Sequence, residues 1–113
     1  MGTVVVNSKF LVKIPAGQTE SETKELGGKV LIGISIPVGF ETADLTIKNA
    51  VQGEVNYQTV KNTDGSSFTM NATADVFINI PVGELVSLEN IKFVSSVAQT
   101  SERELILIAR PIL

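Results

Sequence analysis

The chain has 113 residues, the size of one domain with a single hydrophobic core. It contains no cysteine and no histidine, which excludes disulfide bonds, thiolate ligands, a cysteine nucleophile and the commonest general base at neutral pH. Its formal net charge is −3, with acidic and basic residues spread along the chain, so a clustered basic surface for nucleic acid is not predicted.

Apolar runs such as Leu105–Ala109 are far shorter than the ~20 residues that a membrane-spanning helix needs. The apolar stretch near the N-terminus has no basic region before it, so no signal peptide is predicted. We therefore expect a protein that is made in a cytoplasm and has no membrane partner.

Strand-type residues dominate the chain, and turn residues interrupt them about every ten positions, which is typical of an all-β sandwich or barrel. We predict a single-domain β-sandwich of antiparallel strands over residues 1–113, in which residues 1–8 can form an extended N-terminal arm. The expected strands are 4–6, 9–14, 22–26, 29–36, 44–48, 57–61, 68–70, 75–80, 90–95 and 102–110.

Two of these strands carry information on packing. In 29–36, alternation places isoleucines 32, 34 and 36 on one face and Leu31, Gly33 and Ser35 on the other, where the small residues allow close approach of another group. Leu105–Ala109 is apolar on both faces, which is typical of a central strand that is covered on both sides.

Turns are predicted between the strands. Asn62–Gly65 has the composition of a hairpin tip, and Leu26–Lys29 contains two adjacent glycines suited to a tight turn. Residues 17–21 are expected to form a surface loop, and 84–89 a single helical turn.

A short motif, Ile-Pro-x-Gly, occurs three times, at 14–17, 36–39 and 80–83. The segments 34–48 and 78–92 share seven of fifteen positions at a constant offset of 44. Because proline cannot continue a strand ladder and glycine permits a change of direction, we interpret the motif as a strand end at a corner of the sandwich. A pair of matched binding loops and an internal duplication remain alternatives.

No catalytic, metal or cofactor site is predicted, and we do not expect an enzyme. Serine nucleophiles lack a histidine base. Glu102 and Glu104 flank Arg103 and are interpreted as solvated charges, and Asp64-Gly65 lacks the further acidic ligands of a calcium loop. Phe40, which follows the second Ile-Pro-x-Gly motif, can cap the core or stand in a contact surface.

The chain resembles small virion proteins of tailed bacteriophages. The resemblance covers roughly residues 22–111 and depends on short motifs at 26–28, 31–37, 40, 43, 45–47, 91–95 and 102–111. Two departures from the family pattern are Phe40, where tryptophan is common, and 49–53, where an Asp-Gly turn is common. The resemblance implies a sandwich of jelly-roll type that decorates or cements the head shell, or that belongs to the neck or a fibre, without catalytic residues.

Our first functional hypothesis is a capsid decoration or cement protein. It would act as a homo-oligomer, a dimer or trimer, that binds the major capsid protein and other virion proteins on the head surface, without nucleic acid. The expected contact residues are Thr3, Val4, Val5, Val6, Phe40, Pro111, Ile112 and Leu113. Alternatively, the two termini simply pair into the sheet.

The second hypothesis is a fibre-borne or accessory binding module for a glycan or protein of the host surface. It would use the polar loops 17–21, 52–56 and 62–67, although polar loops are usual in any β domain.

Overall fold

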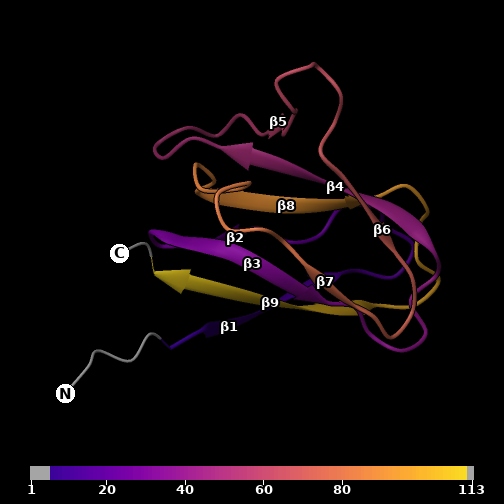
Figure 1. Ribbon diagram of the computed structural model, residues 1–113. Helices are drawn as coiled ribbons and strands as arrows, with labels where there is room; N and C mark the ends of the chain where they lie inside the picture. Colours follow the sequence, from indigo (N-terminus) through magenta and orange to yellow (C-terminus); the bar gives the residue numbers. More distant parts are fainter. Residues whose placement is uncertain (1–5, 112–113) are drawn as a thin grey trace.

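The computed structural model describes residues 6–111, which form two antiparallel sheets facing each other in a β-sandwich (Figure 1). Within this range there is no helix, and therefore none that could cross a membrane. The strands are β1 (Ser8–Ile14), β2 (Lys24–Glu25), β3 (Lys29–Ser35), β4 (Ala43–Ala50), β5 (Gln58–Thr59), β6 (Thr69–Ala72), β7 (Phe77–Asn79), β8 (Asn90–Ser95) and β9 (Arg103–Pro111). Of the predicted strand 4–6 only Val6 is described, and it lies outside any strand; most of the predicted arm lies outside the described residues, and Ser8, the last residue of that arm, already belongs to β1.

The strand order is β1-β9-β3-β7 in the first sheet, called sheet A here, and β2-β8-β4-β5 in the second, sheet B. β5 pairs with the second half of β4, and β6 pairs with the first half of the same strand, so β5 and β6 together act as one interrupted edge strand. From β1 to β4 each strand lies in the other sheet from its predecessor, and the same holds from β6 to β9. The loop between β5 and β6 rises furthest from the sandwich in Figure 1.

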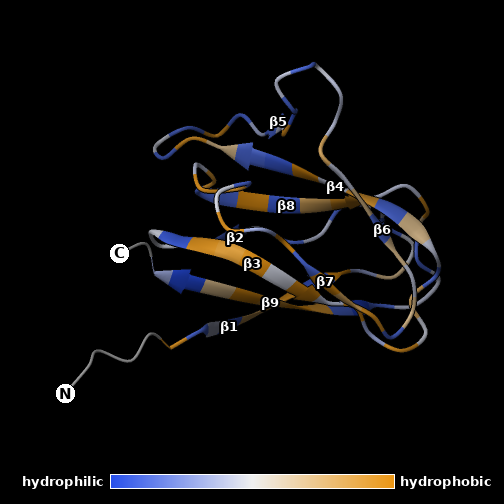
Figure 2. Ribbon diagram, in the orientation of Figure 1, coloured by the Kyte–Doolittle hydropathy of each residue, from blue (hydrophilic) through white to orange (hydrophobic). Residues whose placement is uncertain are grey.

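The core is the space between the sheets, and alternation along the strands fills it. β9 contributes Leu105, Leu107 and Ala109, and β4 contributes Leu45 and Ile47, all fully buried. Apolar colour in Figure 2 is concentrated on β3, on the middle of β9 and along β8.

One prediction for β3 is wrong in part. Leu31 is fully buried and lies opposite Ala109, on the core side, rather than sharing a face with Gly33 and Ser35. The register against β9 shifts between Leu31 and Gly33, so Ile32 is the extra residue of a β-bulge. An extra residue reverses the alternation, which is why strict period-two counting fails before the bulge and holds after it.

The 44-residue offset of the repeat corresponds to a pseudo-two-fold relation between β2-β3-β4 and β6-β7-β8. Ile34 lies directly opposite Ile78, and Lys48 lies directly opposite Lys92, so residues separated by 44 positions meet in pairs. The surrounding hydrogen bonds follow the same relation: the Ile36 amide donates to the Val76 carbonyl, and the Ile80 amide to the Ile32 carbonyl.

All three Ile-Pro-x-Gly motifs end a strand segment in the same turn, as the corner interpretation predicts. The amides of Gln18, Phe40 and Glu84 donate to the carbonyls of the prolines three residues earlier, at distances of 3.1, 3.3 and 3.2 Å. The glycine of each motif has a positive φ, between 77° and 104°, which is the conformation that a type II turn requires at its third position.

The other predicted turns are present, with one difference. The Lys29 amide donates to the Leu26 carbonyl around the two glycines, and the Gly65 amide donates to the Asn62 carbonyl. Residues 82–87 form consecutive turns and no helical turn. The segment joins sheet A to sheet B, and Leu85 and Leu88 anchor it in the core.

Candidate functional site

The predicted contact residues are separated by the fold. Thr3, Val4, Val5, Ile112 and Leu113 lie outside the described residues. Val6 is 69% exposed, and Pro111 is half-buried at the end of β9, opposite Lys29 of β3. Pro111 therefore pairs into the sheet, which agrees with the alternative considered for the termini.

Phe40 is 3% exposed and belongs to the core, so the prediction that places it in a contact surface is wrong. The turn that begins at Pro37 directs the chain from sheet A to sheet B, and the side chain that follows this turn closes the end of the core. The exposed apolar residue at this corner is Val38 instead, and Val82 stands exposed at the equivalent corner.

The outer face of sheet B is polar and charged. At its centre, Lys48 and Lys92 lie opposite each other on β4 and β8. The carboxylate of Glu20 forms ion pairs with the ammonium groups of both lysines, at N–O distances of 2.9 and 3.7 Å. The hydrogen bond from Lys48 is the largest cause that holds the pKa of Glu20 below its ordinary value. Lys92 also lies 4.7 Å from the centre of the Tyr57 ring. These charges are paired within the chain, as on an ordinary solvated face.

The outer face of sheet A is different, because rows of apolar and small residues extend across its four strands. One row of cross-strand neighbours is Leu11, Ile106, Ser35 and Phe77, and the next row contains Ile108 and Gly33. Leu11 is 42% and Phe77 58% exposed, and the two isoleucines are half-buried. We call this surface the apolar face, defined as Leu11, Gly33, Ser35, Phe77, Ile106 and Ile108.

Gly33 is what lets the tip of the Phe77 ring approach β3 on the apolar face. A Cβ at Gly33 would collide with the Phe77 ring, whose tip lies directly above this glycine. The backbone of Gly33 is not in the left-handed region, so the requirement for glycine here is one of space and not of conformation. The close approach expected over Gly33 is therefore made by a side chain of the same protein.

The charged rim of the apolar face is asymmetric. Lys9 and Lys13 lie along β1, at one edge of the sheet. At the opposite edge, Asp75 precedes β7, and its amide donates to the Pro37 carbonyl at 3.2 Å. Lys13 pairs with Glu104, which precedes Ile106 by two residues, and Pro37 follows Ser35, the partner of Ile106, by two residues. Because Asp75 is hydrogen-bonded to Pro37, Lys13, Glu104 and Asp75 lie at the same end of the sheet.

The three loops of the binding-module hypothesis do not converge. Residues 17–21 run beside β8, where Glu20 bridges to Val94 and the Ser95 amide donates to the Thr19 carbonyl. Loops 52–56 and 62–67 flank β5, at the other edge of sheet B. A single ligand of sugar size cannot contact all three.

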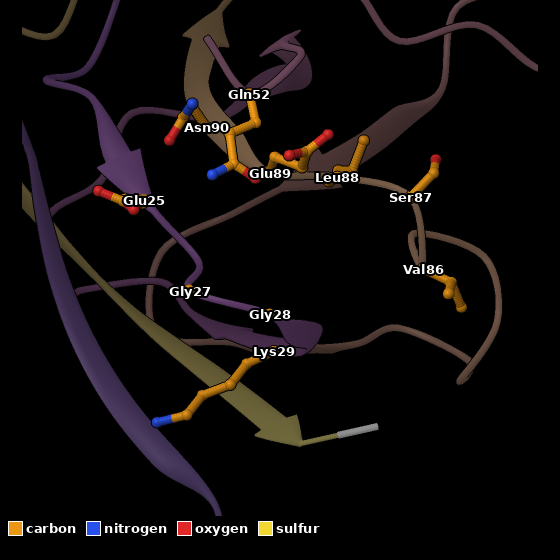
Figure 3. A pocket seen from close by; sticks show the side chains of 10 residues that line it. All are labelled: Glu25, Gly27, Gly28, Lys29, Gln52, Val86, Ser87, Leu88, Glu89 and Asn90. Atoms are coloured by element: carbon orange, nitrogen blue, oxygen red, sulfur yellow. The ribbon is translucent and has the colours of Figure 1, made fainter. Parts of the chain in front are cut away.

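A hollow of about 380 Å³ opens at the end of the sandwich where the β2–β3 turn meets the segment before β8 (Figure 3). Its polar side chains are those of Glu25, Lys29, Gln52, Ser87, Glu89 and Asn90. Figure 3 shows the Lys29 side chain extending away from the two carboxylates, and its ammonium donates to Ser8 Oγ at 2.6 Å. The hollow thus lacks the convergent polar groups that fix a small ligand.

A buried polar cluster at the other end has a structural role. Gln99 is fully buried; its Oε1 accepts from the Glu41 amide at 2.8 Å, and its Nε2 donates to the Glu41 carbonyl at 3.0 Å. The Glu41 carboxylate accepts from the amide and the hydroxyl of Thr100, which holds its pKa below the ordinary value. The cluster ties the corner after Pro37 to the loop before β9, and the sequence offered no signal for it.

Among residues 6–111 there is no group of three or more acidic side chains arranged to hold a metal ion. Glu102 forms an ion pair with Lys13 at 3.8 Å, and both side chains are about half exposed. The surface feature that the fold assembles is therefore the apolar face. Its sequence signal was the strand Leu105–Ala109, apolar on both sides.

Comparison of the chain with protein-family models, with curated proteins and with solved structures found no match.

Proposed function

We propose that this protein is a non-enzymatic assembly protein of a virion, most specifically a capsid decoration or cement protein that self-associates and binds the major capsid protein on the head surface. The observation that carries the assembly role is the contrast between the two outer faces of the sandwich. The face of sheet B carries ion pairs that are satisfied within the chain, whereas that of sheet A carries apolar side chains that residues 6–111 leave partly exposed.

An uncovered apolar sheet face is a reason to infer a partner. A strand that is apolar on both sides is typically covered on both sides, and β9 is fully covered by its own chain on the core side only. Contiguous apolar patches on soluble proteins commonly mark interaction sites. The virion assignment comes from the family resemblance of residues 22–111.

The strand order supports the jelly-roll form of the sandwich. When β5 and β6 count as one interrupted edge strand, eight strands remain, four in each sheet, and consecutive strands alternate between the layers except at the β4–β5 step, which stays in sheet B. This order supports the proposal of two interlocked Greek keys in a double-sheet jelly roll, a fold found in viral capsid proteins and lectins.

The second candidate, a fibre-borne module that binds a host-surface glycan or protein, fits the same fold class but has weaker geometric support. Its three loops lie at separate edges, and the polar hollow lacks convergent groups. An enzyme is third, and only a hydrolase activity lost on a single carboxylate substitution would favour it.

The experiment that tests the proposal is sedimentation of the purified protein with and without purified capsid shells, together with a glycan-array measurement. Saturable co-sedimentation with shells and no array signal is expected. Array binding without shell binding would support the second candidate instead. The absence of both signals would contradict both candidates.

A further inference from the structure

We infer that the apolar face is a self-association surface, covered by the same face of a second copy across a two-fold axis that runs along the strands between β9 and β3. The inference deepens the proposed function and rests on it for the biological role of the dimer. The geometry of the contact is derived from the register of sheet A alone.

The first argument is steric. A two-fold axis parallel to the strands places each row of residues over the same row of the second copy. It also reverses the order of the strands, so β9 of one copy faces β3 of the other. The bulky Ile106 then lies over Ser35 of the second copy, and Ile108 lies over Gly33 of the second copy and the Phe77 ring that covers it. Leu11 meets Phe77 of the second copy at both edges. Ile106 thus opposes a small residue, while Ile108 and Leu11 pack against Phe77, so the apolar side chains of the two copies can interdigitate as in packed sheets.

The second argument is electrostatic. The same axis places Lys13, on the β1 edge, over Asp75 on the β7 edge of the second copy, because both lie at the same end of the sheet. Two such pairs form in each dimer, since the contact is isologous. Lys9 meets the neutral Asn79 of the second copy, so no like charges are brought together in this row.

The size of the face sets the expected affinity. The strands β1, β9, β3 and β7 have 7, 9, 7 and 3 residues, and with strands ~4.8 Å apart they give a flat footprint of roughly 400 Å². Stable complexes bury ~800 Å² on each partner, so the contact is at the small end of specific interfaces. We therefore expect dimers that form in roughly the micromolar range and dissociate on dilution.

The charge pairs permit a test that intramolecular effects cannot imitate. Lys13→Glu places two acidic residues opposite each other at both edges of the homodimer interface, and Asp75→Lys places two basic ones there. Each variant alone should dimerise about tenfold more weakly at low salt, whereas an equimolar mixture should form heterodimers with near-native affinity, since both pairs are then opposite in charge. Sedimentation velocity over a concentration series measures this, and urea unfolding checks that both variants are folded.

A third variant tests the centre of the face. Ile106→Glu should abolish the dimer without unfolding the chain, because the side chain faces outward. Thr46→Glu, at an outward position of the central strand β4, is the matched control and should dimerise normally. A wild-type protein that stays monomeric, an Ile106→Glu variant that dimerises normally, or a mixture that behaves as the single variants do would each overturn the inference.

Shell co-sedimentation of the same samples separates this inference from the proposed function. If the protein is monomeric and binds shells, the proposed capsid role stands and the proposed dimer is refuted. If the protein dimerises with the charge-swap pattern but does not bind shells, the proposed dimer stands and the proposed capsid role is refuted.

Discussion

The contact between Gly33 and Phe77 leads to a quantitative prediction. Gly33→Ala adds a methyl group where the Phe77 ring now lies, so the ring must move off β3. Phe77 is 58% exposed, and about 40% of a side chain of ~200 Å² corresponds to roughly 80 Å² of covered surface. At ~25 cal/mol per Å², the packing that is at risk is worth up to about 2 kcal/mol.

The methyl group also has a favourable effect, because alanine in a strand interior is ~0.5–1 kcal/mol better than glycine. In the native background the two effects oppose each other, and the expected outcome is destabilisation by up to about 1.5 kcal/mol. In a Phe77→Ala background the collision is absent, and the same substitution should stabilise the chain by ~0.5–1 kcal/mol. The sign of the effect therefore reverses with the residue at position 77.

A double-mutant cycle measured by urea unfolding, at a concentration well below that of self-association, gives the coupling energy of the pair. We expect about 1–2 kcal/mol, derived from the burial of the ring. Additive effects within ~0.3 kcal/mol would refute the reasoning, since they would mean that the ring does not occupy the space above Gly33.

Three further predictions concern the scaffold. Gln99→Leu should lower the free energy of unfolding by about 2–4 kcal/mol, because the amide and carbonyl of Glu41 lose their partners; an unchanged urea midpoint would contradict this. The pKa of Glu41 and that of Glu20 are lowered in the folded state, so the stability they contribute is present above the ordinary value of 4.5 and is lost as the pH falls through the lowered folded pKa. Unfolding measured against pH should therefore show a loss of stability on the acid side of 4.5, and Glu41→Gln should reduce it; the same acid slope in the variant would argue against Glu41 as a source. Pro37→Ala or Pro81→Ala should lower stability by about 0.5–1 kcal/mol and leave shell binding intact, and a folded variant that no longer binds shells would identify the corner as an interface.

Local chemistry was enough to predict the strands within residues 6–111 and most of the turns. The three Ile-Pro-x-Gly motifs specify the same turn, because proline ends the ladder and glycine supplies the positive φ that the third position requires. The pair of glycines after Leu26 specifies a tight turn in the same way. These features depend only on residues a few positions apart, so sequence inspection finds them.

The offset of 44 residues was visible in the sequence, but its meaning was not. Only strand pairing shows that Ile34 meets Ile78 and Lys48 meets Lys92, which makes the repeat a pseudo-two-fold of the sandwich. Register over such distances is set by closure of the whole sheet and by hydrogen bonds such as that from the Ile36 amide to Val76. No local pattern contains that information.

The sequence by itself determined an all-β chain, the positions of its turns, and the fact that Leu105–Ala109 is apolar on both sides. Only the tertiary structure decided which of these two sides is left uncovered. A bulge at Ile32 turned Leu31 into the core, and the crossover after Pro37 buried Phe40, for which both a core cap and an exposed contact had been considered. The physical reason is that alternation defines two faces of each strand, whereas layer stacking and a single extra residue decide which face meets the core and which meets solvent or a partner.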